Sequence, residues 1–279
     1  MGRVTRRVPV TRFTHACDGS TTLNRAETLA VEEPLELRID GISTVTTMRT
    51  PGHDVDLALG LLLAEGMISH PDQIATAVHC NDVGPDGRPT FNVLDLARRD
   101  PSTALDLQHR RTFGITSACG VCGSATIDAI RSRQVLPDLK LDTTIVPLDL
   151  MVALPERMRR AQSVFDKTGG LHAAALFRPD GSLVVLREDV GRHNACDKAI
   201  GFAARELGWP LPPLLLTLSG RASFELVQKA WVAGIPIVAA VSAASSLAVE
   251  VAEAAGLTLA GFLRGPSLVC YTAPHRLQT

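Results

Sequence analysis

The sequence predicts an α/β protein, in which a mixed sheet is covered by helices and a smaller α+β domain comes first. The main observation is the regular order of elements in the last third of the chain. Three apolar runs are separated by two amphipathic segments, and such continuous runs are typical of parallel strands buried on both faces. Earlier hairpin patterns add antiparallel strands. We expect strands at 214–218, 235–241 and 257–263, and helices at 223–233 and 245–255.

Length, composition and one charged segment suggest how the chain is divided. Its 279 residues are 46% hydrophobic and 20% charged, which suits one large domain or two ordinary ones. Residues 97–112 are charged and irregular, as is typical of a boundary. We therefore expect an α+β domain over residues 1–112, with a flexible basic N-terminus, and a second domain over residues 113–279.

Local patterns predict the remaining elements. Alternating runs at 35–39 and 42–48 flank Asp40-Gly41, a strong hairpin turn. A helix is expected to begin near Asp54, and two short strands should flank residues 84–87. Further along we expect an arginine-rich amphipathic helix at 154–167, a hairpin of 171–177 with 182–187, and a helix at 194–207 capped by Asn194.

Charge and hydropathy argue against nucleic-acid and membrane partners. The net charge is −1, so no strong field attracts nucleic acid or an anionic membrane. The apolar stretch 233–249 is barely long enough to span a membrane and is broken by Pro236. The basic run from Arg3 to Arg12 is not followed by the apolar segment of a secretory signal, so we expect a solvated tail. A soluble, cytoplasmic protein is the expectation.

A close pair of cysteines is the strongest chemical signal. Cys119 and Cys122 are each followed by a glycine and open a predicted helix, where amide donors and the helix dipole stabilise a reactive thiolate. A structural turn or half of a zinc site are the alternatives. A four-cysteine zinc site needs a second close pair, which the sequence lacks, so no bound metal is expected. The other cysteines, expected to be small buried hydrophobic residues, are Cys17, Cys80, Cys196 and Cys270.

Three loops follow the predicted parallel strands at their carboxyl ends, where ligands bind in such sheets. They are Ser219-Gly220-Arg221, Ser242 to Ser245 and Arg264 to Ser267. Backbone amides at helix starts and two arginines suit a phosphorylated or nucleotide-bearing ligand. The alternative for each loop is a serine that caps a helix beside a solvated arginine.

Two further polar segments contain histidine. The segment Arg187 to Asn194 is dense in charge, and its His193 suits either acid–base chemistry or simple hydrogen bonding. The segment Thr168 to His172 invites comparison with zinc deaminases, which use a His-x-Glu followed by Pro-Cys-x-x-Cys. Here the glutamate is absent and Ala118 replaces the proline, so a working deaminase site is not expected.

Taken together, these motifs resemble the formate dehydrogenase accessory sulfurtransferases, the FdhD family. The similarity runs from about Val31 to Leu277, and the Ser-Ala-Pro-Thr that is frequent in the family stands here as Ser242 to Ser245. The motifs that carry it are Val31 to Glu36, Met48 to Asp54, Ser117 to Gly123, Thr168 to Ala175, Arg187 to Asn194, Ser219 to Arg221 and Gly261 to Gly265.

The resemblance implies a function and a fold. Such proteins carry sulfur from a cysteine desulfurase to the molybdenum cofactor of formate dehydrogenase, bis-molybdopterin guanine dinucleotide. It implies a core similar to cytidine deaminase, a homodimer, and Cys119 as the residue that bears a persulfide. Cys122 would relay the sulfur or release it by forming a disulfide. Guanine nucleotide alone should act as a partial ligand.

The candidate cofactor-binding residues come from the family segment and from the strand-end loops. They are Phe262, Leu263, Arg264, Gly265, Pro266, Ser267, Ser219, Gly220, Arg221 and His193. A chaperone that binds the cofactor without handling sulfur is the competing function, although it would need no exposed thiols. A thiol–disulfide oxidoreductase is a third, but no thioredoxin-like unit leads into Cys119.

Overall fold

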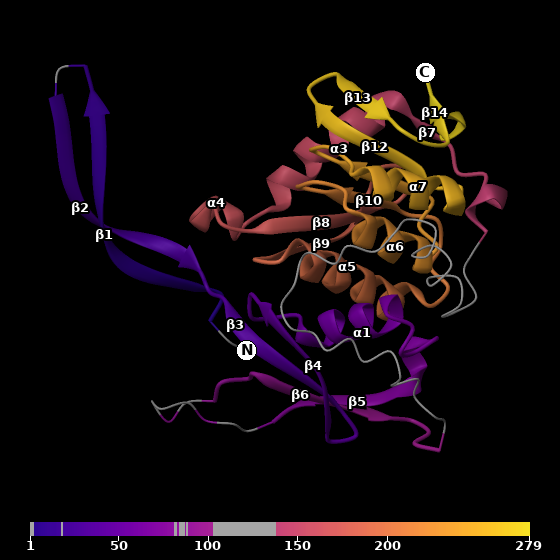
Figure 1. Ribbon diagram of the computed structural model, residues 1–279, viewed down its shortest axis with the longest axis horizontal. Helices are drawn as coiled ribbons and strands as arrows, with labels where there is room; N and C mark the ends of the chain where they lie inside the picture. Colours follow the sequence, from indigo (N-terminus) through magenta and orange to yellow (C-terminus); the bar gives the residue numbers. More distant parts are fainter. Residues whose placement is uncertain (1–2, 18, 81–82, 84–86, 88, 103–137) are drawn as a thin grey trace.

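The computed structural model describes residues 3–17, 19–80, 83, 87, 89–102 and 138–279. Its centre is a six-stranded sheet in the order β13-β12-β11-β10-β8-β9 (Figure 1). The strands are β8 (His172–Phe177), β9 (Leu183–Asp189), β10 (Leu215–Leu218), β11 (Ile237–Ala240), β12 (Thr258–Arg264) and β13 (Ser267–Cys270). The three strands β10, β11 and β12 are parallel and the others antiparallel, which confirms the predicted mixed α/β sheet.

Helices cover both faces of this sheet, because successive strand residues point to opposite sides. Ala174 and Leu176 face one side, where they share a core with α5 (Arg192–Leu207), α6 (Phe224–Val232) and α7 (Ser246–Ala255). Ala173 and Phe177 face the other side, against α3 (Leu148–Ala161). The parallel strands are therefore largely apolar on both faces, as their sequences predicted, with Thr217 of β10 as a buried polar exception. None of the helices in the described part of the chain is both long and apolar enough to cross a membrane.

A smaller sheet is formed by strands that precede the central sheet in the sequence. It has the order β4-β3-β6-β5, from β3 (Glu33–Ile39), β4 (Ile42–Arg49), β5 (Ile74–His79) and β6 (Val93–Arg98). The hairpin β3–β4 turns at Asp40 and Gly41, both with positive φ, which confirms the predicted turn. One buried core runs from β3 through α1 (Asp54–Ala64) to α5. The boundary expected at residue 112 lies outside the described residues, as do Cys119 and Cys122.

Two glycines allow α1 and α5 to pack closely. A side chain on Gly201 would overlap the carbonyl oxygen of Asp56, and one on Gly60 would overlap that of Asp197. Gly201→Ala should therefore force the helices apart and lower the free energy of unfolding by about 1–3 kcal/mol, the usual cost of overpacking. Urea denaturation measures this loss. The matched control is Gly170→Ala, where a Cβ meets only one atom, 3.9 Å away. Equal stability of the two variants would contradict the close packing.

The N-terminus differs from the expected solvated tail. Residues 5–30 form a long antiparallel hairpin of β1 (Thr5–Ala16) and β2 (Gly19–Ala30), and this arm extends away from the rest of the molecule (Figure 1). The residues are mostly exposed, as expected, but the backbone is regular. The basic run therefore lies in a strand, because hydrogen bonds between two strands need no apolar alternation in the sequence.

Other expectations also need correction. The helix predicted at 154–167 starts earlier, as α3, and is followed by the separate short α4 (Phe165–Thr168). It tolerates Pro155 in its interior because Met151, Leu154 and Met158 are buried in the core on that side. Asn194 is not a cap, since α5 begins at Arg192 after Gly191. Of the described cysteines only Cys196 is buried; Cys80 and Cys270 are half-buried and Cys17 is exposed. Short β7 (Val146–Pro147) and β14 (Leu277–Gln278) pair with each other.

Candidate functional site

The three strand-end loops lie side by side, as predicted for the carboxyl ends of parallel strands. The amide of Ser242 donates to the carbonyl of Gly220 at 3.2 Å, and the amide of Phe262 donates to the carbonyl of Ser242 at 3.1 Å. Ala222 and Ala244 form a parallel bridge between the first two loops. Residues that are far apart in sequence are thereby joined at one edge of the central sheet.

A cleft of about 750 Å³ opens beside these loops, between them and helices α3 and α4. This volume lies within the range of roughly 300–1,000 Å³ that is usual for small-molecule sites. Of the candidate cofactor-binding residues, Ser219, Leu263 and Gly265 line it, together with His172. Arg159 of α3 also lines the cleft, where it packs over the Phe165 ring and pairs with Asp166 at 2.6 Å.

The remaining loop candidates are not among the residues that line the cleft in the described part of the chain. Arg221 is exposed at the first loop, and the turn from Arg264 through Gly265 and Pro266 to Ser267 is exposed between β12 and β13. Phe262 has a positive φ of 52° and is 42% exposed. A non-glycine residue rarely adopts this conformation, and it re-aims the chain after Gly261, where the pairing of β12 with β13 shifts register.

The capping alternative holds for one of the loops. Ser245 accepts a hydrogen bond from the amide of Ala248 and so caps α7. Ser223 precedes α6 without such a side-chain cap. The hydroxyl of Ser219 accepts a hydrogen bond from the amide of Ala173 at 2.8 Å, which links the first loop to the start of β8.

His172 is the histidine that faces the cleft. Partial burial lowers its pKa, and the positive field of Arg192 and of His193 lowers it further. The imidazole is therefore neutral at physiological pH and offers one donor and one acceptor to a ligand. Gly220 lies directly beside it, since a Cβ there would be 3.5 Å from Nδ1 of His172. From the sequence, His172 stands out only by comparison with zinc deaminases and is not among the predicted binding residues.

His193 has partners within the protein. Its Nε2 lies 2.7 Å from a carboxylate oxygen of Glu225 and 3.4 Å from the hydroxyl of Ser223. This arrangement ties the start of α5 to the start of α6. Hydrogen bonding, one of the two roles considered for His193, is thus present.

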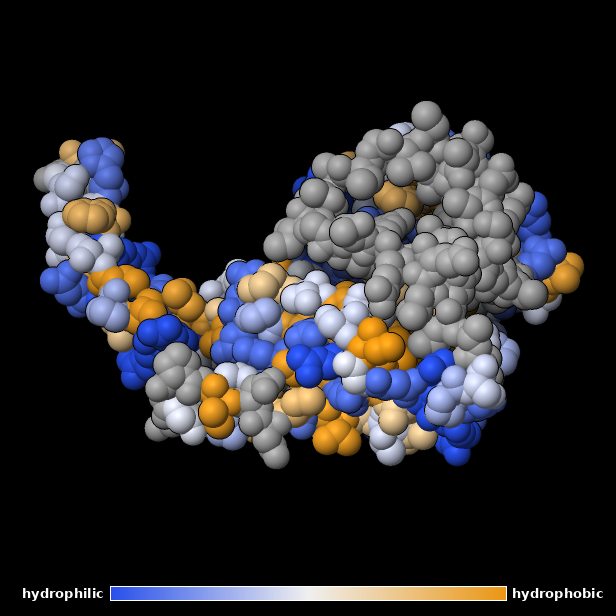
Figure 2. Space-filling model, turned by 60° about the horizontal axis from the view of Figure 1, so that its bottom comes forward, coloured by the Kyte–Doolittle hydropathy of each residue, from blue (hydrophilic) through white to orange (hydrophobic). Residues whose placement is uncertain are grey.

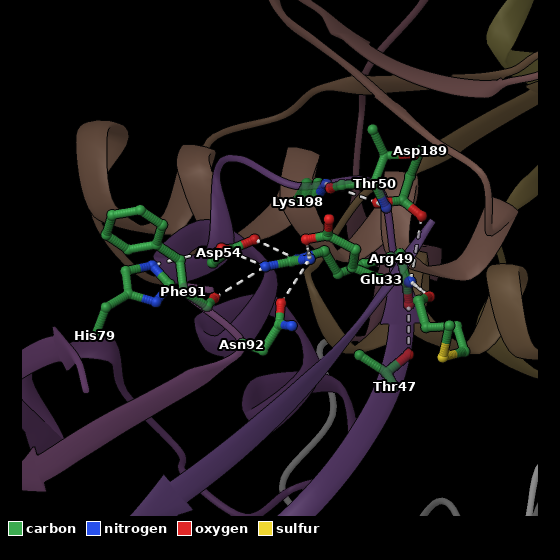
Figure 3. Close-up of polar contacts among 12 residues, drawn as sticks. Glu33, Thr47, Arg49, Thr50, Asp54, His79, Phe91, Asn92, Asp189 and Lys198 are labelled. Atoms are coloured by element: carbon green, nitrogen blue, oxygen red, sulfur yellow. Dashed lines mark hydrogen bonds and ion pairs between the residues drawn. The ribbon is translucent and has the colours of Figure 1, made fainter. Parts of the chain in front are cut away.

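The charged segment that contains His193 is anchored by Asp189, which is fully buried (Figure 3). Its carboxylate accepts from the Lys198 ammonium at 2.6 Å, from the Thr50 amide at 3.1 Å and from the Gly191 amide at 2.8 Å. Lys198 also donates to the Thr50 carbonyl at 2.8 Å, and Asn194 donates to the Met48 carbonyl at 2.7 Å. Two motifs of the resemblance, Met48 to Asp54 and Arg187 to Asn194, therefore bind each other.

Lys198 and Thr50 are positioning residues that the sequence reasoning missed. Lys198 lies on the buried face of α5 among small residues, and a lysine in such a pattern signals a buried carboxylate partner. The neighbouring Glu188 has a similar local role, because it accepts from the amides of Val164 and Phe165 at 2.9 and 2.7 Å. Phe165 lines the cleft, so Glu188 fixes part of its wall.

Arg49 extends this buried network toward the smaller sheet (Figure 3). Its guanidinium is fully buried, pairs with both carboxylate oxygens of Asp54 at 3.1 and 3.3 Å, and donates to the Phe91 carbonyl at 3.0 Å. His79 approaches the same carboxylate at 3.4 Å and meets the Phe91 ring edge-on. Together with the contacts of Thr50, these contacts give Arg49, Thr50 and Asp54 of the Met48 to Asp54 motif structural roles.

Cys119 and Cys122 lie outside the described residues. Within the described ranges, no group of three or more histidine, cysteine or acidic side chains is arranged to hold a metal ion.

Comparison with known proteins identifies the family. The model of the FdhD/NarQ family matches residues 30–278. A protein of Nocardia farcinica named "Sulfur carrier protein FdhD" is 50% identical over 278 residues, which is 100% of this chain and 96% of that protein. Relatives of the same name in Streptomyces avermitilis and Mycobacterium tuberculosis are 48% and 49% identical, covering 99% and 91% of this chain and 97% and 93% of their own length.

A solved structure shares the fold. The crystal structure of a putative formate dehydrogenase accessory protein from Desulfotalea psychrophila superposes with a TM-score of 0.71 at 20% identity, covering 98% of this chain and 99% of that one. At that identity the likeness speaks for the fold alone. The match of the family model to nearly the whole chain, and relatives at about half identity, show that this chain belongs to the FdhD/NarQ family.

Proposed function

We propose that this chain is a sulfur carrier that takes sulfur from a cysteine desulfurase and delivers it to the molybdenum cofactor of formate dehydrogenase. The observation that carries the proposal is the identity of about half of all residues, over the full length, with proteins named as FdhD sulfur carriers. The Cys119-x-x-Cys122 pair supplies the thiol that a carrier needs. A homodimer is part of the same proposal.

The proposed sulfur step uses thiolate exchange. The thiolate of Cys119 attacks the terminal sulfur of a persulfide on the desulfurase, the S–S bond of the donor breaks, and a new S–S bond forms on Cys119. The donor cysteine leaves as a thiolate and takes up a proton. Oxidation states balance, so the step needs no external oxidant. Cys122 then either relays the sulfur or displaces it by forming a disulfide with Cys119.

The cleft is the proposed place for the substrate, bis-molybdopterin guanine dinucleotide. The metal belongs to this substrate, so the chain needs no metal of its own. The cleft has room for a guanine nucleotide portion, and Arg159, His172 and Ser219 supply polar groups on its wall. Arg221 and Arg264 at the exposed loops add forked donors that suit phosphate oxygens.

A cofactor chaperone that never handles sulfur is the second candidate function. The observation that favours it is the cleft itself, whose described wall offers Arg159, His172 and Ser219 as polar groups for a cofactor. Incubation with a cysteine desulfurase and cysteine, followed by intact-protein mass spectrometry, separates the two. A carrier gains about 32 Da, the mass of one transferred sulfur atom. A chaperone keeps its original mass.

Guanine nucleotide binding should depend on the loop arginines. Arg264→Ala and Arg221→Ala should each weaken the binding of GDP roughly tenfold, because one charge-assisted contact is worth about 1.5 kcal/mol or more. Isothermal titration calorimetry measures the affinity. Arg178→Ala is the matched control, since Arg178 is an exposed arginine just after β8, at the opposite end of the same sheet.

The same variants should still accept sulfur on Cys119, because the arginines take no part in the thiolate step. Equal GDP affinity in the wild type and both loop variants would place the phosphates elsewhere. Loss of GDP binding in the Arg178 control as well would point to a general effect of charge.

A further inference from the structure

The arm formed by β1 and β2 is the largest feature of the fold that the proposed function does not use. Each strand has 12 residues, so at 3.3–3.4 Å per residue the arm is about 40 Å long. Most residues of β2 are exposed and none of them is buried. A two-stranded ribbon is at best marginally stable in water, so a regular arm of this length requires something to cover it.

One face of the arm is suited to being covered. In an antiparallel pair, residues opposite each other share a face and successive residues alternate. The register places Arg12 opposite Leu23 and Arg6 opposite Leu29. Val8 and Val10 lie between these pairs on the same face. We call the four apolar side chains Val8, Val10, Leu23 and Leu29 the arm stripe; its two leucines are 59% and 44% exposed.

The arm also differs in charge from the remainder of the chain. Residues 1–30 contain five arginines against Asp18 and Glu27, a net charge of +3. Because the whole chain carries −1, residues 31–279 carry −4. Basic and apolar side chains alternate along the arm, and a hollow separates the arm from the bulk of the molecule (Figure 2). This difference in charge favours contact between the arm and the body of another copy.

A second copy of the chain would also cover the arm stripe permanently. A sulfur donor or an acceptor enzyme binds only during transfer and would leave the arm stripe bare between encounters. A second copy is present at equal concentration at all times, and a two-fold axis lets both arms be covered by the same contact. An arm of about 40 Å is long enough to reach across a protomer of this size.

We propose that the arm, residues 5–30, packs its stripe against a second copy of this chain. The proposal rests on the homodimer of the proposed function and assigns its interface. It is independent of the sulfur step, because no thiol of the Cys119 and Cys122 pair lies in the arm.

Sedimentation equilibrium of the full chain tests the assignment. The wild type should approach twice the 29.7 kDa of one chain. Leu23→Glu with Leu29→Glu should raise the dissociation constant of the dimer roughly a hundredfold or more, since two apolar side chains can no longer be buried. Thr22→Glu with Thr28→Glu is the matched control, which adds the same charge to the neighbouring positions on the opposite face. This control should remain a dimer.

Other outcomes overturn the proposal. Stripe and control variants that stay equally dimeric would place the dimer interface elsewhere and leave the homodimer itself intact. A monomeric wild type would overturn both the homodimer and the assigned interface. The same holds for an arm whose amides become protected from hydrogen exchange only when desulfurase, nucleic acid or anionic vesicles are added. Persulfide loading of Cys119 in the stripe variant reports separately on the sulfur step.

A measurement on the wild type alone guards against a stripe variant that does not fold. Amide hydrogen exchange in β1 and β2 should become slower as protein concentration rises through the dimer dissociation constant. Exchange in the arm that does not change with concentration, in a protein whose mass does change, overturns the assignment.

Discussion

Cys119→Ala is expected to abolish the activation of formate dehydrogenase. The alanine has no thiolate, so no S–S bond to the transferred sulfur can form, and no other residue in the mechanism substitutes for it. The persulfide mass gain of about 32 Da after desulfurase treatment should disappear in the same variant. Enzyme activity after co-expression and intact-protein mass are the two measurements.

Two other cysteines provide the controls for this loss. Cys17→Ala removes an exposed thiol at the tip of the arm and should leave both readouts unchanged. Cys122→Ala should lengthen the lifetime of the Cys119 persulfide if Cys122 resolves it, and should leave it unchanged if Cys122 is structural. Full activation of formate dehydrogenase by Cys119→Ala would refute the carrier mechanism and favour the chaperone.

Lys198→Ala is expected to cause the second large effect, on stability. Asp189 and Lys198 are both buried, and the alanine leaves the Asp189 carboxylate without its charged partner. Breaking a buried pair in this way costs about 3–5 kcal/mol of folding free energy. The Thr50 carbonyl also loses its ammonium donor, so the contact between the Met48 to Asp54 and Arg187 to Asn194 motifs weakens. Urea unfolding monitored by circular dichroism measures the change.

A surface ion pair serves as the comparison. Arg160 and Glu156 are 3.0 Å apart on α3 but strongly exposed, so Arg160→Ala should cost at most about 1 kcal/mol. If the Lys198 and Arg160 variants lose similar stability, the Asp189 cluster does not hold the two motifs together. A loss confined to Lys198→Ala supports its role in positioning the loop that carries Val190 to the cleft.

Local sequence patterns were sufficient to predict those helices and strands whose neighbours in space are also neighbours in the sequence. Asp40-Gly41 between two alternating runs predicted the β3–β4 hairpin, and three apolar runs separated by amphipathic segments predicted β10, β11 and β12 as parallel strands. The start of α3 and the regular arm were missed. In α3 the burial of Met151 and Met158 outweighs the unfavourable Pro155, and burial cannot be read from local propensity.

The sequence by itself determined the class of fold, the presence of the Cys119 and Cys122 pair and the family to which the motifs point. It also predicted that three strand-end loops meet at one edge, because parallel strands align their carboxyl ends. Only the tertiary structure decided that Asp189 binds Lys198 and Thr50, that His172 faces the cleft and that His193 pairs with Glu225. These contacts join residues from distant segments, and their partners depend on how helices and sheets pack rather than on any local spacing.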